Sequence, residues 1–358
     1  MEFKEIIQKL IEKKDLTREE TEQAMLQIME GKLSDLEIAN FLVALKSKGE
    51  TIEEITACAR IMREKSVKIK IKNKPNQDGN IINFIDMCGT GGDKSNTFNI
   101  STAASFIVAG AGIIVAKHGN KSVSSKCGSA DVLAELGVNI NLSPELVEQC
   151  INKIGIGFIF APNFHPAMKF VANARKQLGV RTVFNMLGPL TNPASPKAQV
   201  IGVFDANLTE AYANVLKNLG LERALVVNGS GLDEITLHDK TKITELKEDK
   251  IKTYYITPEE LGFKRYNLDE VKTDSVQQNA DVIRLILNNL NEGKDANMAN
   301  IAAARDFAVV NAAAGIYVAG KASSLKDAIS IARESISSGK AREKLEQLKD
   351  FTNINSTS

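Results

Sequence analysis

The sequence of 358 residues has no tryptophan, only four cysteines and a net charge of +1. The cysteines (Cys58, Cys88, Cys127 and Cys150) are scattered without paired spacing, which argues against a disulfide framework or a zinc site. The near-zero charge gives no overall field that favours nucleic acid. The longest apolar run, 106–116, is too short and glycine-rich to span a bilayer, and the charged N-terminus has no signal-peptide core. We expect a cytoplasmic protein.

The N-terminal part of the chain has a purely helical pattern. Capping boxes of the form Ser/Thr-x-x-Glu begin at Thr17, Ser34 and Thr51, and each precedes apolar residues at helical spacing. A chain of this length is typical of two domains. We therefore predict a small helical domain over residues 1–72.

A lysine-rich segment, 65–74, follows these helices and alternates lysine with valine and isoleucine. The alternation fits an edge strand that lysines protect, and it equally fits a hinge linker. Nucleic-acid binding is a weaker third interpretation, because no aromatic residue lies between the lysines. The turn-rich segment 75–80 then leads into a larger α/β domain.

Two polar loops follow two neighbouring predicted strands in the stretch 84–137. The strand 81–87 leads into the glycine loop 89–93, and the strand 113–116 leads into a lysine- and serine-rich loop, 117–125. Open α/β sheets bind ligands at the carboxyl ends of their strands. Glycines let backbone N–H groups approach an anion, and a helix N-terminus adds partial positive charge. Two such loops predict a ligand with phosphate at two places.

The glycine loop matches neither of two common nucleotide motifs. No Gly-Lys-Ser/Thr follows at the spacing of a Walker A motif, and Gly-x-Gly-x-x-Gly is not completed after Gly89 and Gly91. An ATPase and a dehydrogenase are both disfavoured.

Strands and helices alternate through most of the remaining chain. Strands are predicted at 156–161, 200–204 and 223–227, and a small antiparallel group of short strands at 235–239, 242–247 and 252–257. Helices are predicted at 144–153, 209–219, 279–290, 302–320 and as a pair over 323–345. Asn311 is a polar residue inside the apolar helix 302–320, so it needs a hydrogen-bonding partner.

A third glycine loop, 228–234, closes on two adjacent carboxylates, Asp233 and Glu234. Mg²⁺ typically uses one or two carboxylates together with substrate phosphates. Acidic residues are common in loops, so the pair gains weight only from its place in a phosphate-binding sheet.

Three segments of the chain are distinctive: GTGGD with TFNIST, AKHGNKSVSSKCGSADVL, and HPAMKFVANARKQLGVRTVFNMLGPLTNP. Together they closely resemble the anthranilate phosphoribosyltransferase family. The resemblance covers nearly the whole chain, and the third segment is the most specific. Related pyrimidine nucleoside phosphorylases share the fold and the glycine loops but not that run. Members of the family join anthranilate to 5-phosphoribosyl 1-diphosphate (PRPP) in tryptophan biosynthesis.

The resemblance also implies an architecture. We expect a mainly parallel sheet in a large α/β domain, 73–164 and 189–358, and a small helical domain completed by helices near 165–188. The prolines of the loop 183–193 would return the chain to the large domain. The substrate cleft would lie between the two domains. The family also implies a homodimer that associates through the helical domain, while an anthranilate synthase subunit stays open as a further partner.

The resemblance assigns roles to single residues. Mg²⁺, two ions per subunit, would bind Ser101, Asp233 and Glu234. Lys117 would neutralise the leaving diphosphate. The resemblance places PRPP at Gly89, Gly91, Gly92, Asp93, Thr97, Asn99, Ile100, Ser101, Thr102, Lys117, His118, Gly119, Asn120, Lys121, Ser122, Val123, Ser124, Ser125 and Ser129.

Anthranilate would be held by Gly89, Asn120 and Arg175, because the guanidinium fork of an arginine suits a carboxylate. We assign no general acid or base. His118 and His165 are candidates for proton transfer, and a structural role for His165 between prolines is equally open.

Two alternatives remain at this point. A nucleoside phosphorylase of the same fold is disfavoured by Asp233-Glu234 and the run FNMLGPLTNP. A non-enzymatic relative that binds nucleic acid is disfavoured by the low net charge. The segment 272–275 departs from the family, which has a Gly-Gly step before the helix that holds Asn279, and this leaves the local loop geometry open.

Overall fold

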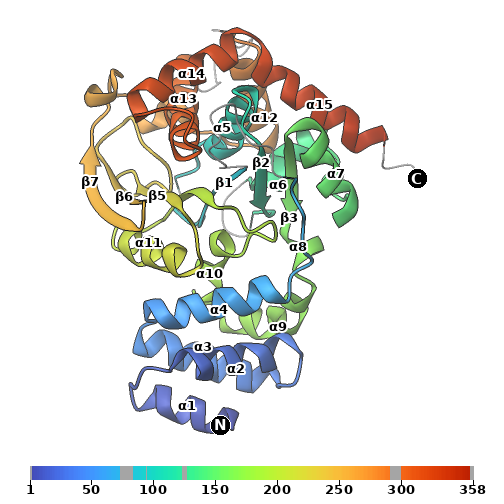
Figure 1. Cartoon of the computed structure of the whole chain (residues 1–358), viewed down its shortest axis with the longest axis vertical. Helices are drawn as coiled ribbons and strands as arrows, with labels where there is room; N and C mark the ends of the chain where they lie inside the picture. Colours follow the sequence, from blue (N-terminus) through green and yellow to red (C-terminus); the bar gives the residue numbers. More distant parts are fainter. Residues whose placement is uncertain (1, 73–83, 94, 123–126, 291–299, 355–358) are drawn as a thin grey trace.

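The computed structural model describes residues 2–72, 84–93, 95–122, 127–290 and 300–354. Three predicted PRPP contacts, Val123, Ser124 and Ser125, lie outside these ranges. Figure 1 shows a helical bundle at one end of the molecule and a sheet covered by further helices at the other.

The N-terminal helices form the bundle. Each predicted capping box is present: the hydroxyl of Thr17, Ser34 or Thr51 accepts the N–H three residues on, and the glutamate there accepts the cap N–H. A helix from mid-chain, α9 (Lys169–Leu178), packs against α2 and α3. This packing is what a discontinuous helical domain requires, although the domain boundaries stay a prediction. The bundle helices are α1 (Phe3–Ile11), α2 (Arg18–Met29), α3 (Asp35–Lys48) and α4 (Ile52–Glu64).

The sheet has seven strands in the order β3-β2-β1-β4-β5-β6-β7. The first five strands of this order are parallel, and β6 and β7 are antiparallel additions. The mainly parallel sheet is therefore confirmed, and the carboxyl ends of five strands share one edge. The strands are β1 (Ile85–Gly89), β2 (Val115–Gly119), β3 (Ile156–Phe160), β4 (Ala198–Gly202), β5 (Arg223–Asn228), β6 (Thr241–Lys247) and β7 (Lys250–Ile256).

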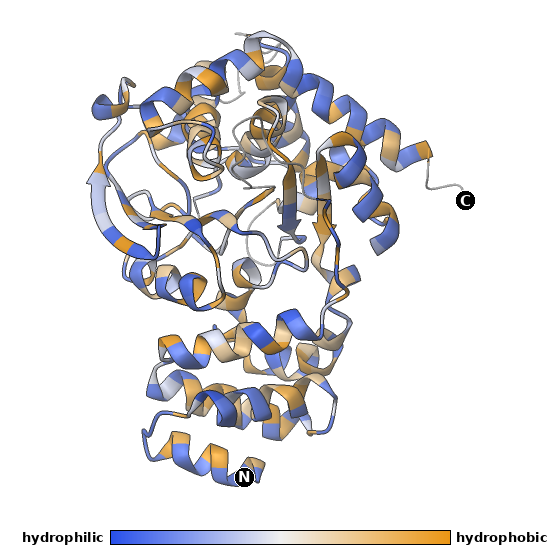
Figure 2. Ribbon diagram, viewed as in Figure 1, coloured by the Kyte–Doolittle hydropathy of each residue, from blue (hydrophilic) through white to orange (hydrophobic). Residues whose placement is uncertain are grey.

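One long helix lies at the centre of the α/β part. α13 (Ile301–Val318) is long and apolar enough to cross a membrane, but 83% of it is buried in the fold and it packs on α5 and α14, so it is a core helix. In Figure 2 the outer helix α15 alternates hydrophilic and hydrophobic stretches, as a surface helix does. The other helices are α5 (Ile100–Gly110), α6 (Ser129–Glu135), α7 (Pro144–Ile154), α8 (Ala161–Phe164), α10 (Phe184–Leu187), α11 (Leu208–Asn218), α12 (Val276–Leu287), α14 (Leu325–Ser337) and α15 (Lys340–Ile354), with 3₁₀ turns η1 (Pro166–Met168), η2 (Gly188–Leu190), η3 (Glu259–Leu261) and η4 (Leu268–Val271).

The two faces of the sheet pack into different cores. Ile85 and Leu225 belong to a core shared with α5 and α12–α15. Ile201 and Val226 belong to a second core that continues through α11 into the bundle. The bundle is thus joined to the sheet by continuous apolar packing.

Two predictions about elements need correction. The residues 235–239 form no strand, because the backbone N–H and C=O of Ile235 are both bonded by a side chain of α13. β2 extends to Gly119 by pairing with β3, so Lys117 and His118 are strand residues rather than loop residues. Of the two interpretations left open for the lysine-rich segment, the described part, 65–72, agrees with the linker, because it forms no strand; Val67 anchors it by donating its N–H to the Phe164 carbonyl.

Candidate active site

The glycine loop is built against the carboxylate of Asp233. Gly91 and Gly92 adopt φ of +66° and +79°, the left-handed region that favours glycine. The Gly91 N–H donates to Asp233 Oδ2 at 2.7 Å. A Cβ atom on Gly89 would lie 2.3 Å from the same oxygen. Only glycine at position 89 lets the carboxylate lie this close to the end of β1.

The start of α5 meets the second carboxylate and the lysine of β2. The Ser101 N–H donates to Glu234 Oε1 at 3.0 Å. Lys117 Nζ lies 3.2 Å from the Ser101 hydroxyl and donates to the Met87 carbonyl at 2.7 Å. The four residues predicted for metal binding and charge neutralisation therefore form one constellation.

Burial and neighbouring charges shift the pKa values of the charged side chains in this constellation. Both carboxylates are only half-buried, yet loss of hydration is the main cause that raises their pKa values. Burial, and then the charge of Asp93, raises the pKa of Asp233 to about 7. Burial and the neighbouring Asp233 raise the pKa of Glu234 well above its ordinary range. Burial also lowers the pKa of Lys117, which the charge of Asp86 opposes most strongly.

This donor set fits Mg²⁺. Two adjacent carboxylates with raised pKa values repel each other, and a hard cation that takes oxygen ligands relieves that repulsion. Within the described ranges no cluster of three or more His, Cys, Asp or Glu side chains is placed to hold a metal. A cation here would therefore complete its coordination with the Ser101 hydroxyl and with oxygen atoms of a substrate.

The loop after β2 is held at both of its ends by one side chain. The Asp131 carboxylate accepts the N–H of Ser122 at 3.0 Å and the N–H of Gly128 at 2.9 Å. The carbonyl of Asn120 accepts the hydroxyl of Ser129 at 3.3 Å. Asp131 was not among the predicted site residues, and the only signal for it is its capping position three residues into α6.

Two buried asparagines fix the backbone on either side of the constellation. Asn311 accepts the N–H of Ile235 and donates to its carbonyl, both at 2.9 Å. Asn279 accepts the N–H of Asn99 at 2.9 Å and donates to its side-chain oxygen at 3.1 Å. The partner that the sequence requires for Asn311 is thus the residue directly after the carboxylate pair.

The segment that departs from the family, 272–275, pairs with the chain before α5. Lys272 forms an antiparallel bridge with Thr97, a predicted PRPP contact, and the Thr273 N–H donates to the Asn96 carbonyl at 3.0 Å. The segment 272–275 therefore still pairs with the chain before α5, although its sequence departs from that of the family.

The two candidate histidines, one on β2 and the other directly after α8, lie together. The ring centroids of His118 and His165 are 5.3 Å apart, and His118 Nδ1 lies 3.2 Å from the Gly188 carbonyl. Burial lowers the pKa of His118 to about 3 and that of His165 to about 4, so both rings are neutral at pH 7. In the described part of the chain neither Nε2 atom has a hydrogen-bond partner.

Arg175 is available to bind an anion. Its guanidinium lies over the ring of Phe184, 5.4 Å from the centroid, and has no ion-pair or hydrogen-bond partner among the residues that the structure describes. Burial lowers its pKa. No hydrogen bond or ion pair joins Arg175 to Gly89 or Asn120. That these three residues bind anthranilate together therefore stays a prediction.

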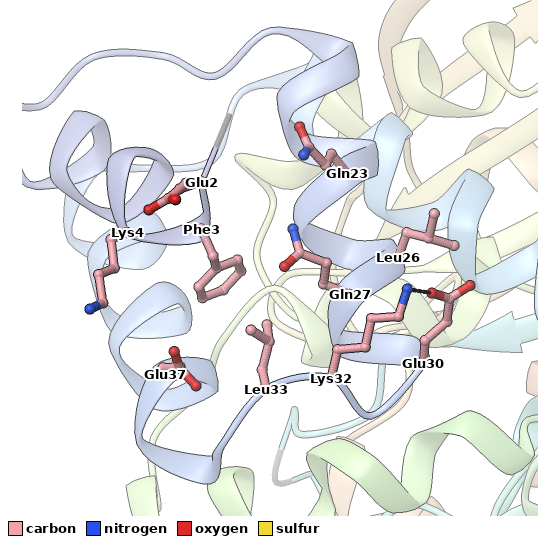
Figure 3. A pocket seen from close by; sticks show the side chains of 10 residues that line it. All are labelled: Glu2, Phe3, Lys4, Gln23, Leu26, Gln27, Glu30, Lys32, Leu33 and Glu37. Atoms are coloured by element: carbon pink, nitrogen blue, oxygen red, sulfur yellow. Dashed lines mark ion pairs between the residues drawn. The ribbon is translucent and has the colours of Figure 1, made fainter.

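A pocket in the bundle lies away from all of these residues. It has a volume of about 600 Å³ and opens between α1, α2 and the start of α3 (Figure 3). Bundle residues alone line it, so it differs from the predicted cleft between the domains. The lining residues are Glu2, Phe3, Lys4, Gln23, Leu26, Gln27, Glu30, Lys32, Leu33 and Glu37.

The fold and the site define a class of enzyme. A parallel sheet with a glycine loop, a hydroxyl-rich helix start and a carboxylate pair at one edge is suited to transferring a phosphorylated sugar. The model of the glycosyl transferase family, a/b domain, matches residues 82–342, and that of the glycosyl transferase family, helical bundle domain, matches residues 4–66.

Individual relatives narrow this class. The chain is 50% identical to the anthranilate phosphoribosyltransferase of Acetivibrio thermocellus, over 98% of this chain and 97% of the relative. The crystal structure of the Thermus thermophilus enzyme is 40% identical with a TM-score of 0.88, over 97% and 99% of the two chains. The Saccharomyces cerevisiae enzyme in complex with PRPP and Mg is 26% identical with a TM-score of 0.85, over 98% of both chains, and a complex with 4-fluoroanthranilate also matches.

The chain therefore belongs to the anthranilate phosphoribosyltransferase family, and the resemblance seen in the sequence is confirmed. The nucleoside phosphorylase and the nucleic-acid-binding relative are set aside.

Proposed function

We propose that PRPP and anthranilate bind at the carboxyl edge of the sheet, with Mg²⁺ held by Ser101, Asp233 and Glu234. The reaction, as in the family to which the chain belongs, transfers the phosphoribosyl group of PRPP to the amine of anthranilate and releases diphosphate. It is an early step of tryptophan biosynthesis. The observation that carries the site is the carboxylate pair, held beside Lys117 and the glycine loop.

The chemical difficulty is the charge that develops on diphosphate as it leaves the anomeric carbon. The buried ammonium of Lys117 is fixed by the Met87 carbonyl and the Ser101 hydroxyl, so it needs no reorganisation during the reaction. Backbone N–H groups of the loop 91–93 add partial positive charge. Mg²⁺, when bound, would neutralise further charge as a Lewis acid.

Two Mg²⁺ ions per subunit suit the arrangement of the carboxylates. Asp233 accepts from the glycine loop, whereas Glu234 accepts from the start of α5. The two side chains thus meet different segments of the chain, and each can ligate its own cation.

Arg175 would bind the carboxylate of anthranilate, because its unpartnered donor fork matches that group. Asn120 and Gly89 would place the ring against PRPP. The neutral rings of His118 and His165 have pKa values too low for an efficient general base at pH 7. An aromatic amine needs little activation, so no general base is assigned.

The fluorescence of anthranilate tests the reaction. Purified protein, PRPP and Mg²⁺ should lower the signal as the amine is ribosylated, and EDTA should prevent the loss. Loss without added metal, or no loss at any PRPP concentration in folded protein, would contradict the proposal. Phosphorolysis of nucleosides would then be assayed in its place.

A homodimer through the bundle is supported by exposed apolar side chains. Leu36 and Val43 lie seven residues apart on one face of α3 and are 70% and 42% exposed, and Ile11 at the end of α1 is 59% exposed. L36D/V43D should sediment as a monomer. The matched control is I354D, which changes an apolar residue of 73% exposure on α15 and should leave a dimer intact.

We also propose a cytoplasmic location, which is supported by Cys58, Cys88 and Cys150, three cysteines that form no disulfide. An anthranilate synthase subunit stays a hypothetical partner, and co-purification with that subunit would test it.

A further inference from the structure

An arginine at the end of α9 reaches across to the glycine loop. α9 ends at Leu178, the next residue Gly179 adopts a left-handed conformation, and Arg181 lies two residues further on. Arg181 Nη2 donates to the Gly92 carbonyl at 2.7 Å. The guanidinium also lies 4.0 Å from the centroid of the Phe204 ring. The side chain remains exposed, so it contributes little to the packing of the core.

The aromatic platform under this arginine is itself tied to the glycine loop. Thr90 donates its N–H to the Gly202 carbonyl at 2.9 Å, and its hydroxyl accepts the N–H of Phe204 at 3.1 Å. Arg181, Phe204 and the loop therefore form one connected unit, although their positions in the sequence are far apart.

The contact fixes the orientation of one peptide group. In a planar trans peptide the carbonyl and the following N–H point in opposite directions, so a fixed Gly92 carbonyl also fixes the N–H of Asp93. On the other side of the loop, Gly91 is fixed by Asp233. A Cβ atom on Gly92 would lie 2.5 Å from Arg181 Nη2, so the arginine occupies the space beside a residue whose φ of +79° favours glycine.

We propose that Arg181 is a positioning residue for PRPP, which holds the Gly92–Asp93 peptide in the orientation that receives the diphosphate. Its permanent positive charge also lies beside the place where the diphosphate charge is bound. The inference rests on the proposed function and adds a residue that the sequence analysis did not include. It also gives a role to the bundle, because α9 carries Arg175 and leads directly into this arginine.

Substitution of an exposed side chain tests the proposal without damage to the core. R181A should raise KM for PRPP about tenfold or more, since a hydrogen bond to a charged group is lost. KM for anthranilate and the thermal unfolding midpoint should change little. R181K keeps the charge but loses the planar fork and should fall between R181A and the parent. F204L should move KM for PRPP in the same direction.

The matched control is R333A. Arg333 lies on α14 and is also exposed, and its guanidinium lies 5.2 Å from the centroid of the Phe263 ring. Equal KM values for R181A and R333A would overturn the proposal. So would a change in R181A that affects both KM values and the unfolding midpoint alike, because that result indicates a structural role.

Direct titration of PRPP with Mg²⁺ separates this proposal from the function on which it rests. A parent protein that binds no PRPP contradicts the proposed function itself. A parent that binds PRPP only as tightly as R181A does contradicts the role of Arg181 alone.

Discussion

Two carboxylate sites in this molecule differ in how the protein compensates their charge. In the bundle, Glu54 is fully buried. It accepts the N–H groups of Leu16 at 2.9 Å and Thr51 at 2.8 Å, and it forms an ion pair with Lys48 at 2.9 Å. Its donors come from the residue before the N-cap of α2 and from the adjoining ends of α3 and α4, so the charge ties these parts of the bundle together.

At the sheet edge, Asp233 and Glu234 are adjacent and half-buried, and the nearby Lys117 gives its hydrogen bonds to Met87 and Ser101 instead. Both pKa values are raised. A carboxylate that the protein compensates serves stability, whereas an undercompensated pair that remains open to solvent is suited to binding a cation.

The largest expected effect comes from removing the charge of the pair. D233N/E234Q should lower kcat/KM at least about 10³-fold, because electrostatic stabilisation of the leaving group is lost. Its unfolding midpoint without metal should equal or exceed that of the parent, since like charges no longer repel. Steady-state kinetics and thermal melts with and without Mg²⁺ measure both effects. A metal-dependent rise in midpoint equal to that of the parent would contradict the assignment.

Substitution of the compensated carboxylate should give the opposite result. E54Q should lower the free energy of unfolding by about 3 kcal/mol, because a buried ion pair is broken. KM for PRPP should stay unchanged. The matched control is E12Q, in an exposed pair with Lys14, which should change the free energy of unfolding far less. Urea denaturation that ranks the two variants equally would refute the comparison.

The histidines extend the comparison to pH. Their pKa values in the folded protein, about 3 for His118 and about 4 for His165, lie below the unfolded value, so the unfolded chain binds more protons below pH 6.5. Stability is therefore lost as pH falls from 6.5 towards 4, by about 2 kcal/mol for each histidine at pH 5. H118N/H165N should lose correspondingly less stability between pH 7 and pH 5. Parallel pH profiles for parent and variant would contradict this account.

The smallest effect concerns the support of the pair. N311A should lower the free energy of unfolding by about 1 to 2 kcal/mol, because both backbone groups of Ile235 lose their partners. It should also raise the Mg²⁺ concentration for half-maximal activity, whereas A312G, a neighbouring buried change on α13, should affect stability alone. If N311A leaves the Mg²⁺ requirement unchanged, Asn311 serves only the fold.

Local chemistry made part of this structure predictable from the sequence. The capping boxes at Thr17, Ser34 and Thr51 involve residues three apart, and the glycine loops follow apolar strands directly. The contacts of Arg181 with Gly92 and of Asn311 with Ile235 join residues 89 and 76 positions apart. No local pattern encodes such pairs, and the second one also explains the wrongly predicted strand at 235–239.

Calorimetric titration of Mn²⁺ into metal-free protein at pH 6.5, in two buffers of different ionisation enthalpy, tests the central claim most directly. Carboxylates with raised pKa values must lose protons to bind a cation. We expect binding with release of about one proton or more, and no such binding in D233N/E234Q. Binding of equal affinity in that variant, or binding by the parent without proton release, would contradict the assignment of Asp233 and Glu234 as the metal site.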